Sequence, residues 1–164
     1  MNSPTYNVLF LCAENSTCSI MAEVIMNRLG HRNFRAFSAG TDPSGEVHPF
    51  TLAELRRSGL PTAACRSKSW HEFAVPGAPK MDFVFTLCDD VASKVRRVSP
   101  YLTITGHWRI DNPTMAVDSD ADRQHAFSRA CTQIATRIRL FLSLPLTKLD
   151  GLAHQEALEE TEMV

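Results

Sequence analysis

The chain has 164 residues, of which 44% are hydrophobic and 21% charged, and its formal net charge at pH 7 is −1. This length suits one domain with a full-sized core, and the near-neutral charge argues against a nucleic-acid or membrane surface as the main partner. The apolar runs are too short to span a membrane, and the first residues lack a secretory signal, so we expect a cytoplasmic protein.

Apolar segments of strand and helix character alternate along the chain. We predict, in chain order, a strand at 6–11, a helix at 19–30, a strand at 34–38, a helix at 49–58, a short helix around 69–73, a strand at 83–87, a helix around 90–97, a strand at 102–105 and a helix at 121–144. This order predicts an α/β fold, a four-stranded parallel sheet with helices on both faces. Residues 1–145 would form this single domain. Residues 146–164 would be a C-terminal tail that could hold another helix.

The first predicted strand ends in Cys12, and a loop of mostly small residues leads from it into the first helix. The amides of such a loop converge on one spot, where the helix dipole adds positive potential. A thiol held there tends to ionise into a nucleophile, and the same concavity binds an oxyanion. The predicted oxyanion-binding residues are Ala13, Glu14, Asn15, Ser16, Thr17 and Cys18.

The polar residues of this loop allow two compatible interpretations. Asn15, Ser16 and Thr17 are ordinary turn and cap residues, and Cys12 could be a small apolar residue at the end of a core strand. Alternatively, Ser19 donates a hydrogen bond to the thiolate of Cys12, and Asn15 braces the loop from within.

Two further candidates, Cys88 and Asp111, also follow predicted strands. The carboxyl ends of parallel strands share one edge of a sheet, so both residues can meet Cys12 there. Cys88 could equally be an inert core thiol, and Asp111, before Asn112 and Pro113, could serve only a turn. The five cysteines lack the spacing of a disulfide framework or a zinc site, and the six histidines lack metal-ligand spacing, so we expect reduced thiols and no metal.

Several motifs together resemble one known family. The run Val8-Leu9-Phe10-Leu11-Cys12-x-x-Asn15-Ser16-x-x-Ser19-x-Met21-Ala22-Glu23 resembles the signature of low-molecular-weight protein tyrosine phosphatases and of the arsenate reductases built on their fold. Further matches are Phe37-Ser38-Ala39-Gly40, Thr86-Leu87-Cys88-Asp89 and His107-Trp108-x-x-Asp111-x-Pro113. The last two resemble the reductase branch more than the phosphatases.

The resemblance implies an arsenate reductase that acts through thiols. Cys12 would attack arsenate, Asp111 would donate a proton to the leaving oxygen, and Cys88 would resolve the adduct, which leaves arsenite and a Cys12–Cys88 disulfide. A third relay thiol of the family would fall near Val95 or Arg96, and neither is a cysteine. We therefore expect an external reductant, either glutaredoxin with glutathione or thioredoxin acting directly, and no bound cofactor.

The chain departs from the family at Cys18, which stands where the family loop has arginine. A guanidinium binds two oxyanion oxygens at once, so its loss would weaken oxyanion binding by ~3–6 kcal/mol and raise the pKa of Cys12. Glu14 would repel an anion unless it points into solvent. Three explanations of Cys18 remain open. The arginine was lost by mutation, Cys18 is a second thiol able to pair with Cys12 or bind arsenic, or the arginine was replaced by cysteine in the laboratory. The missing cation could come from Arg66, Arg96, Arg97 or Arg109.

The leading hypothesis is an arsenate reductase of this phosphatase-like type. The alternative is a catalytically impaired relative that binds an oxyanion or a protein partner through the inherited loop. A residual phosphatase ranks third, because efficient phosphotyrosine hydrolysis is not expected without the arginine. Cys65 and Cys131 are expected only to pack.

Overall fold

The computed structural model describes residues 5–88, 91, 104–115 and 118–153. Its strands are β1 (Tyr6–Cys12), β2 (Phe34–Gly40), β3 (Phe83–Thr86) and β4 (Gly106–His107). Its helices are α1 (Cys18–Leu29), α2 (Pro49–Arg57), α4 (Asp120–Leu142) and α5 (Leu146–Leu152), with short 3-10 turns η1 (Trp70–Phe73) and η2 (Pro113–Met115).

The four strands form one parallel sheet in the order β2-β1-β3-β4. β1 lies in the middle, where Val8 pairs with Ala36 on one side and with Phe83 on the other. The strands are apolar because both faces of the sheet are covered. The predicted α/β fold with a four-stranded parallel sheet is confirmed, and all strand carboxyl ends point to one edge.

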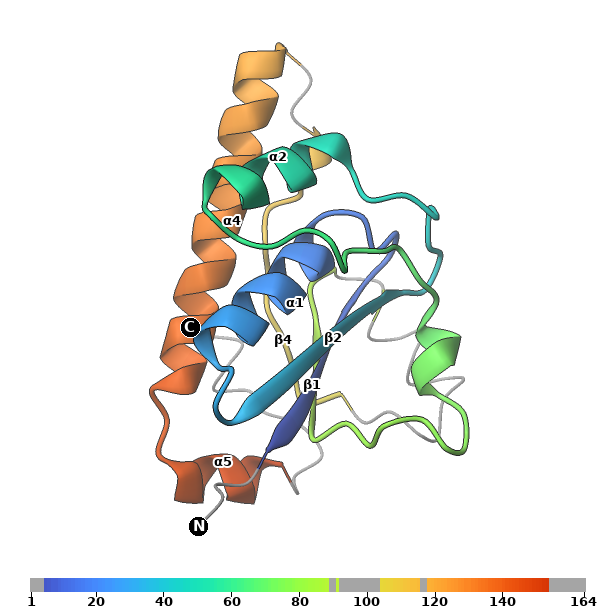
Figure 1. Cartoon of the computed structure of the whole chain (residues 1–164), viewed down its shortest axis with the longest axis vertical. Coiled ribbons are helices and arrows are strands. Elements are labelled where there is room, and N and C mark those ends of the chain that lie inside the picture. Colours follow the sequence, from blue (N-terminus) through green and yellow to red (C-terminus); the bar gives the residue numbers. More distant parts are fainter. Residues whose placement is uncertain (1–4, 89–90, 92–103, 116–117, 154–164) are drawn as a thin grey trace.

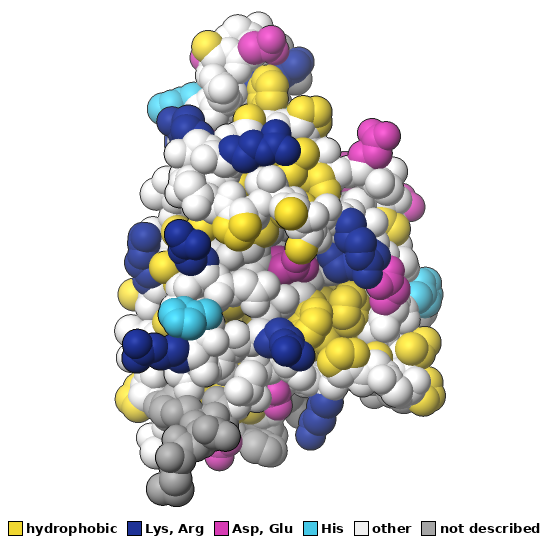
Figure 2. All heavy atoms as spheres, in the orientation of Figure 1, with side chains coloured by type: hydrophobic (Ala, Val, Ile, Leu, Met, Phe, Trp, Pro, Cys, Tyr) yellow, Lys and Arg dark blue, Asp and Glu magenta, His cyan; other side chains and the backbone are white. Residues whose placement is uncertain are grey.

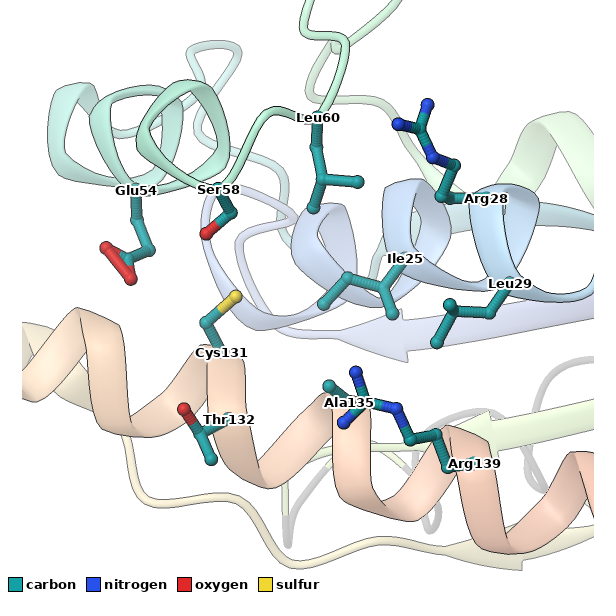
Figure 3. A pocket seen from close by; sticks show the side chains of 10 residues that line it. All are labelled: Ile25, Arg28, Leu29, Glu54, Ser58, Leu60, Cys131, Thr132, Ala135 and Arg139. Carbon is teal, nitrogen blue, oxygen red and sulfur yellow. The ribbon is translucent and has the colours of Figure 1, made fainter.

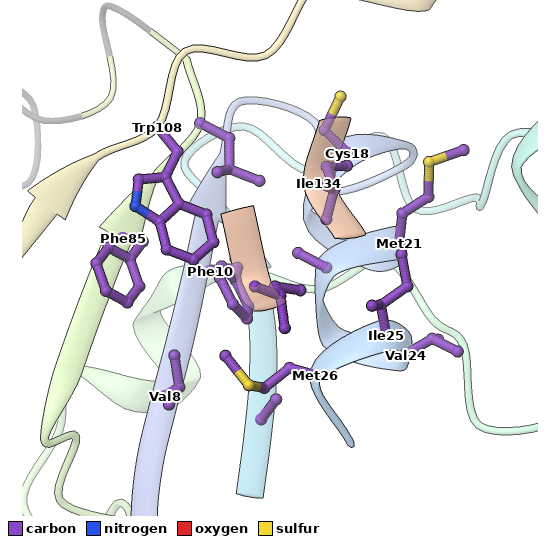
Figure 4. Close-up of a cluster of buried hydrophobic side chains, with 14 of the residues drawn as sticks. Val8, Phe10, Cys18, Met21, Val24, Ile25, Met26, Phe85, Trp108 and Ile134 are labelled. Atoms are coloured by element: carbon purple, nitrogen blue, oxygen red, sulfur yellow. The ribbon is translucent and has the colours of Figure 1, made fainter. Parts of the chain in front are cut away.

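Alternate residues of β1 enter two separate cores. Val8 and Phe10 belong to the larger core, which α1 and α4 cover, while Leu9 and Leu11 face a smaller core against η1. Figure 1 shows α1 and α4 to one side of the sheet and η1 to the other. In Figure 4, Phe10 lies among side chains of β3 and α1 in the larger core.

The C-terminal part of the described chain also packs into the larger core. α5 runs across the end of the molecule close to where β1 begins (Figure 1). Its Leu149 is 1% exposed and belongs to the same core as Val8. The helix expected after residue 146 is therefore present and packed. Within the described ranges, no helix combines the length and apolar character needed to cross a bilayer.

The fourth strand lies later in the chain than predicted. The sequence predicts a strand at 102–105, but residues 104–105 lie outside the regular ladder and β4 spans Gly106–His107. The amide of Thr105 still bonds to the carbonyl of Val84 at 2.7 Å, while the amide of Val84 bonds to the side-chain oxygen of Thr105 at 2.8 Å. These two bonds attach Thr105 to β3 just before regular pairing starts at Gly106.

Two of the predicted segments fall partly or wholly outside the described residues. These are positions 102–103 of the fourth strand and, except for Val91, which is helical, the helix around 90–97. The other elements agree with their predicted bounds to within one or two residues at each end.

Gly40, the last residue of β2, lies against the loop that follows β1. A Cβ atom at this position would lie 2.5 Å from the carbonyl oxygen of Ala13 and 3.0 Å from the amide nitrogen of Asn15. Both neighbours are backbone atoms, so neither can move aside without a change in the loop. The absence of a side chain at position 40 therefore sets how closely β2 and the loop approach.

We predict that Gly40→Ala lowers the free energy of unfolding by about 1–3 kcal/mol, because the added methyl group must push the loop away. Urea denaturation measures this change. Gly151→Ala is the matched control, because no atom lies within 4 Å of a Cβ at that helical position. Equal stability of Gly40→Ala and the parent chain would contradict the prediction.

Candidate oxyanion and thiol site

The loop between β1 and α1 is held by its carbonyl groups. Backbone amides of Thr41, Asp42, Ser44 and His48 donate to the carbonyl oxygens of loop residues 12, 13, 14 and 16, at 2.8–3.1 Å. In the described part of the chain, the amides of residues 14–17 donate to no other residue. With its acceptors tied to the framework and its donors unpaired, this loop can bind an anion.

The start of α1 adds to the capacity of the loop to bind an anion. Thr17 is the N-cap residue, yet its side chain makes no capping hydrogen bond, and the first turn of the helix holds no acidic residue. The first amides of a helix lack partners within the helix, and the dipole places partial positive charge there. The N-terminus of α1 therefore contributes attraction for a negative ligand without a cation in the loop.

Asn15 braces the loop from within, as predicted. Its φ of 51° lies in the left-handed region, which asparagine tolerates better than most residues. Its side-chain amide donates to Ser19 at 2.8 Å and to Ser38 at 3.0 Å, and its carbonyl oxygen accepts from the amide of Lys68 at 2.9 Å. The side chain is fully buried, so these three bonds join the loop to α1, β2 and the segment before η1.

A buried ion pair next to Asn15 is a feature of the candidate site that the sequence did not indicate. Lys68 is 8% exposed, and its ammonium lies 3.4 Å from Glu23 and 3.3 Å from Ser38. The one signal in the sequence is the spacing of Ser19 and Glu23, which places both side chains on the same face of α1. Lys68 itself comes from an irregular stretch whose path the sequence does not reveal.

The structure brings Cys12 and Cys88 into direct contact. Their Sγ atoms lie 2.9 Å apart, a hydrogen-bond contact between thiols that is longer than a disulfide bond. The pairing of β1 with β3 explains this contact, since Leu11 lies opposite Thr86 and each cysteine follows one or two residues later. Cys12 is half-buried, so its sulfur is neither sealed in the core nor fully solvated.

The surroundings of Cys12 oppose the ionisation that its position at the loop favours. The neighbouring Cys88 thiol, above all through the hydrogen bond between the two sulfurs, and burial raise the pKa of Cys12 well above its usual range. The backbone amide of Ala13 lowers this pKa but does not offset the increase. The raised pKa of Cys12 has the direction expected for a loop without arginine, and the Cys88 contact is its largest cause.

Cys18 is a neutral, buried thiol in the first turn of α1. It is 6% exposed, and burial raises its pKa to about 12, with smaller contributions from Cys88 and Asp111. Figure 4 shows its sulfur at the start of α1, pointing away from Phe10 and Met26. The residue therefore brings no charge to the loop, either attractive or repulsive, at physiological pH.

The remaining predicted site residues lie in the loop or in the first turn of α1, and they differ in exposure. Glu14 is exposed, so its carboxylate is largely screened by solvent. Ser16 and Thr17 are buried, and their hydroxyls lie 3.5 Å apart. Ser19 is fully buried and accepts a hydrogen bond from Asn15.

Asp111 lies beyond β4, at the same edge of the sheet as the cysteines. It is exposed, and Gln133 of α4 lies 3.4 Å from both its amide and its carboxylate. Asp111 is the smallest of the three causes that raise the pKa of Cys18. Trp108 is a core residue, 1% exposed and stacked on Phe85 with ring centroids 4.3 Å apart.

Two of the four arginines expected as substitutes for the loop cation, Arg66 and Arg109, lie within the described residues. Arg66 forms an ion pair with Glu72, with a shortest distance of 2.7 Å, and Arg109 is exposed. Arg96 and Arg97, like the relay positions Val95 and Arg96, lie outside the described residues. Among the described side chains, no group of three His, Cys, Asp or Glu residues is arranged to hold a metal ion.

Cys131 and Cys65 lie away from the loop, in packed positions as predicted. Cys131 borders a hollow of about 280 Å³ between α1, α2 and α4, and no loop residue lines this hollow. Figure 3 shows its sulfur pointing into the space between these helices, with Arg28 and Arg139 at the rim. Figure 2 shows basic side chains standing between hydrophobic and acidic ones on this face.

Comparison with known proteins agrees with the fold. The sequence profile of the low molecular weight phosphotyrosine protein phosphatases matches residues 7–155. The arsenate reductase of Shouchella clausii is 30% identical over 134 residues, which cover 82% of this chain and 93% of that protein.

Solved structures of the same fold include two arsenate reductases. One, in the phosphate-binding state, has a TM-score of 0.64 and 24% identity, covering 85% of this chain and 98% of its own. The thioredoxin-dependent enzyme of Corynebacterium glutamicum has a TM-score of 0.60 and 21% identity, covering 92% of this chain and 65% of its own. With the family profile and the 30% identical relative, these likenesses lead to one conclusion: the chain belongs to the low-molecular-weight phosphotyrosine protein phosphatase family, in its arsenate reductase branch.

Proposed function

We propose that this protein reduces arsenate to arsenite, with Cys12 as the nucleophile and Cys88 as the resolving thiol. The observation that carries the proposal is the contact of 2.9 Å between the two sulfurs. A phosphatase needs only one thiol, because its covalent intermediate is hydrolysed by water. A second thiol in contact with the nucleophile is what a two-electron reduction requires, since two thiols become one disulfide.

The reaction proceeds in two steps at the loop. The thiolate of Cys12 first displaces an oxygen from arsenate, which Asp111 protonates as it leaves, and a sulfur–arsenic(V) bond forms. The thiolate of Cys88 then attacks the sulfur of Cys12. The sulfur–sulfur bond forms, the sulfur–arsenic bond breaks, and its electron pair remains on arsenic, which leaves as arsenite.

An external thiol system closes the cycle by reducing the Cys12–Cys88 disulfide. Glutaredoxin with glutathione, or thioredoxin acting directly, supplies the two electrons through thiol–disulfide exchange. A structural neighbour is described as thioredoxin-dependent, which supports a dithiol protein as the donor. The half-buried position of Cys12 is consistent with attack by such a partner.

One observation favours a second candidate function, the binding of an oxyanion without turnover. Cys18 leaves the loop without a cation, and the pKa of Cys12 is raised, so both anion binding and nucleophilic attack are weakened. A protein of this kind would hold phosphate or arsenate, or a protein partner, on its loop amides. The assay below separates the two candidates.

We predict that arsenate drives NADPH oxidation when either thioredoxin with its reductase or glutaredoxin with glutathione and its reductase is supplied. Cys12→Ser and Cys88→Ser should each abolish this rate, because one thiol cannot supply two electrons. Cys65→Ser is the control and should keep the parent rate. A parent chain that gives no rate with either donor, yet binds arsenate in calorimetry, is the oxyanion-binding protein instead.

We predict that Cys88→Ala lowers the pKa of Cys12 by about one unit or more, because the Cys88 thiol is the main cause of the increase. The variant should therefore be alkylated faster by iodoacetamide at pH 8. Mass spectrometry of the Cys12 peptide across a pH series gives the midpoint. An unchanged midpoint relative to Cys65→Ala would refute the assigned cause.

We predict that Cys18→Arg strengthens phosphate binding by about 10²-fold or more, because a guanidinium adds two charge-assisted hydrogen bonds to the loop. Isothermal titration calorimetry measures the dissociation constant. Cys18→Met, an uncharged side chain, is the matched control. Equal affinity of the Arg and Met variants would mean that the loop cannot use a cation at this position.

A further inference from the structure

A hollow of about 280 Å³ lies between α1, α4 and the end of α2, and no residue of the loop after β1 lines it. This volume is close to the ~300 Å³ at which pockets for small molecules begin. In Figure 3, Ile25 and Leu29 of α1 point toward α4, and Leu60 points toward α1, so the middle of the hollow is apolar. Leu29 is 41% exposed, and an apolar ligand group in the hollow would remove part of this surface from water.

Two arginines line the same hollow, one from each of the helices α1 and α4. Arg28 lies in the last turn of α1, and Arg139 lies in the last turn of α4. Both residues are exposed, and no hydrogen bond or ion pair joins either guanidinium to another described residue. A guanidinium presents its donors in a planar fork that matches a carboxylate. Because both side chains are long and unpaired, they can turn toward a carboxylate held between the two helices.

The hollow also contains an acid, Glu54, whose charge is already paired. Its side chain is 5% exposed and accepts hydrogen bonds from the guanidinium of Arg57, the shortest at 2.7 Å. In Figure 3, Glu54 lies at one end of the hollow, and Arg28 and Arg139 lie toward the other. A ligand with one anionic end would therefore place that end near the arginines and its apolar part toward Cys131.

We propose that this hollow binds the anion of a small amphipathic carboxylic acid, such as a medium-chain fatty acid, at a site separate from the loop after β1. The carboxylate binds the two arginines, and the hydrocarbon chain covers Leu29, Leu60 and Ala135. Burial of the chain supplies most of the affinity, and the arginines select an anion over a cationic analogue. The proposal does not depend on arsenate reduction, because none of the residues assigned to that reaction lines the hollow.

Isothermal titration calorimetry with octanoate tests the proposal. We expect octanoate to bind to the parent chain, and octylamine, which carries the opposite charge on the same hydrocarbon chain, to bind about tenfold more weakly. The double variant Arg28→Gln/Arg139→Gln should bind octanoate about tenfold more weakly, because two exposed charge pairs are lost. Arg35→Gln is the matched control, since this exposed arginine of β2 does not line the hollow. Absence of octanoate binding, or equal affinity of the double variant and the control, would overturn the proposal.

Two thiols report where the ligand lies. Cys131 lines this hollow, whereas Cys65 lines a neighbouring hollow of about 320 Å³, which Arg28 also borders. Octanoate should slow alkylation of Cys131 by iodoacetamide and leave the rate of Cys65 unchanged, as measured by mass spectrometry of the two peptides. Ala135→Phe fills the hollow and leaves both arginines in place, so it should abolish binding. A Cys131 rate that octanoate does not slow, or octanoate binding retained by Ala135→Phe, would refute the assigned site.

Discussion

The arrangement of the loop after β1 depends on where its backbone carbonyls are bonded. Four amides from the segment after β2 hold the carbonyls of loop residues 12, 13, 14 and 16, and Gly40 allows this segment to approach closely. Because the acceptors are satisfied by the framework, the donors are left for a ligand. The site is therefore organised by backbone bonds before any side chain contributes.

The side chains of this site have opposing effects on the reactivity of Cys12. The contact between Cys12 and Cys88 suits the exchange of two electrons, but it also raises the pKa of Cys12. Cys18 offers no cation to reverse this effect. The buried hydrogen bonds that join Lys68, Ser38, Asn15 and Ser19 hold the loop against α1 and β2.

Much of this organisation could be predicted from the sequence because it follows from local patterns. The apolar strand before Cys12, the polar loop and the amphipathic helix predict the parallel sheet and the position of the anion site, and strand order brings Cys88 to the same edge. Residues 104–105 were predicted as strand although the ladder begins at Gly106, because the bond from Val84 to the Thr105 hydroxyl leaves no trace in the sequence pattern. Lys68 was missed because its burial depends on the path of an irregular segment. The effect of Cys88 on the pKa of Cys12 could not be predicted from local patterns, because it depends on a contact between two strands.

The absence of a formal positive charge in the loop also affects how a bound oxyanion would respond to dissolved salt. Mobile ions screen the attraction between full charges at exposed positions most strongly, and they affect short-range dipoles in a partly buried concavity much less. A site built on the unpaired amides of residues 14–17 and the start of α1 would therefore hold its ligand weakly, yet lose little of that affinity as ionic strength rises.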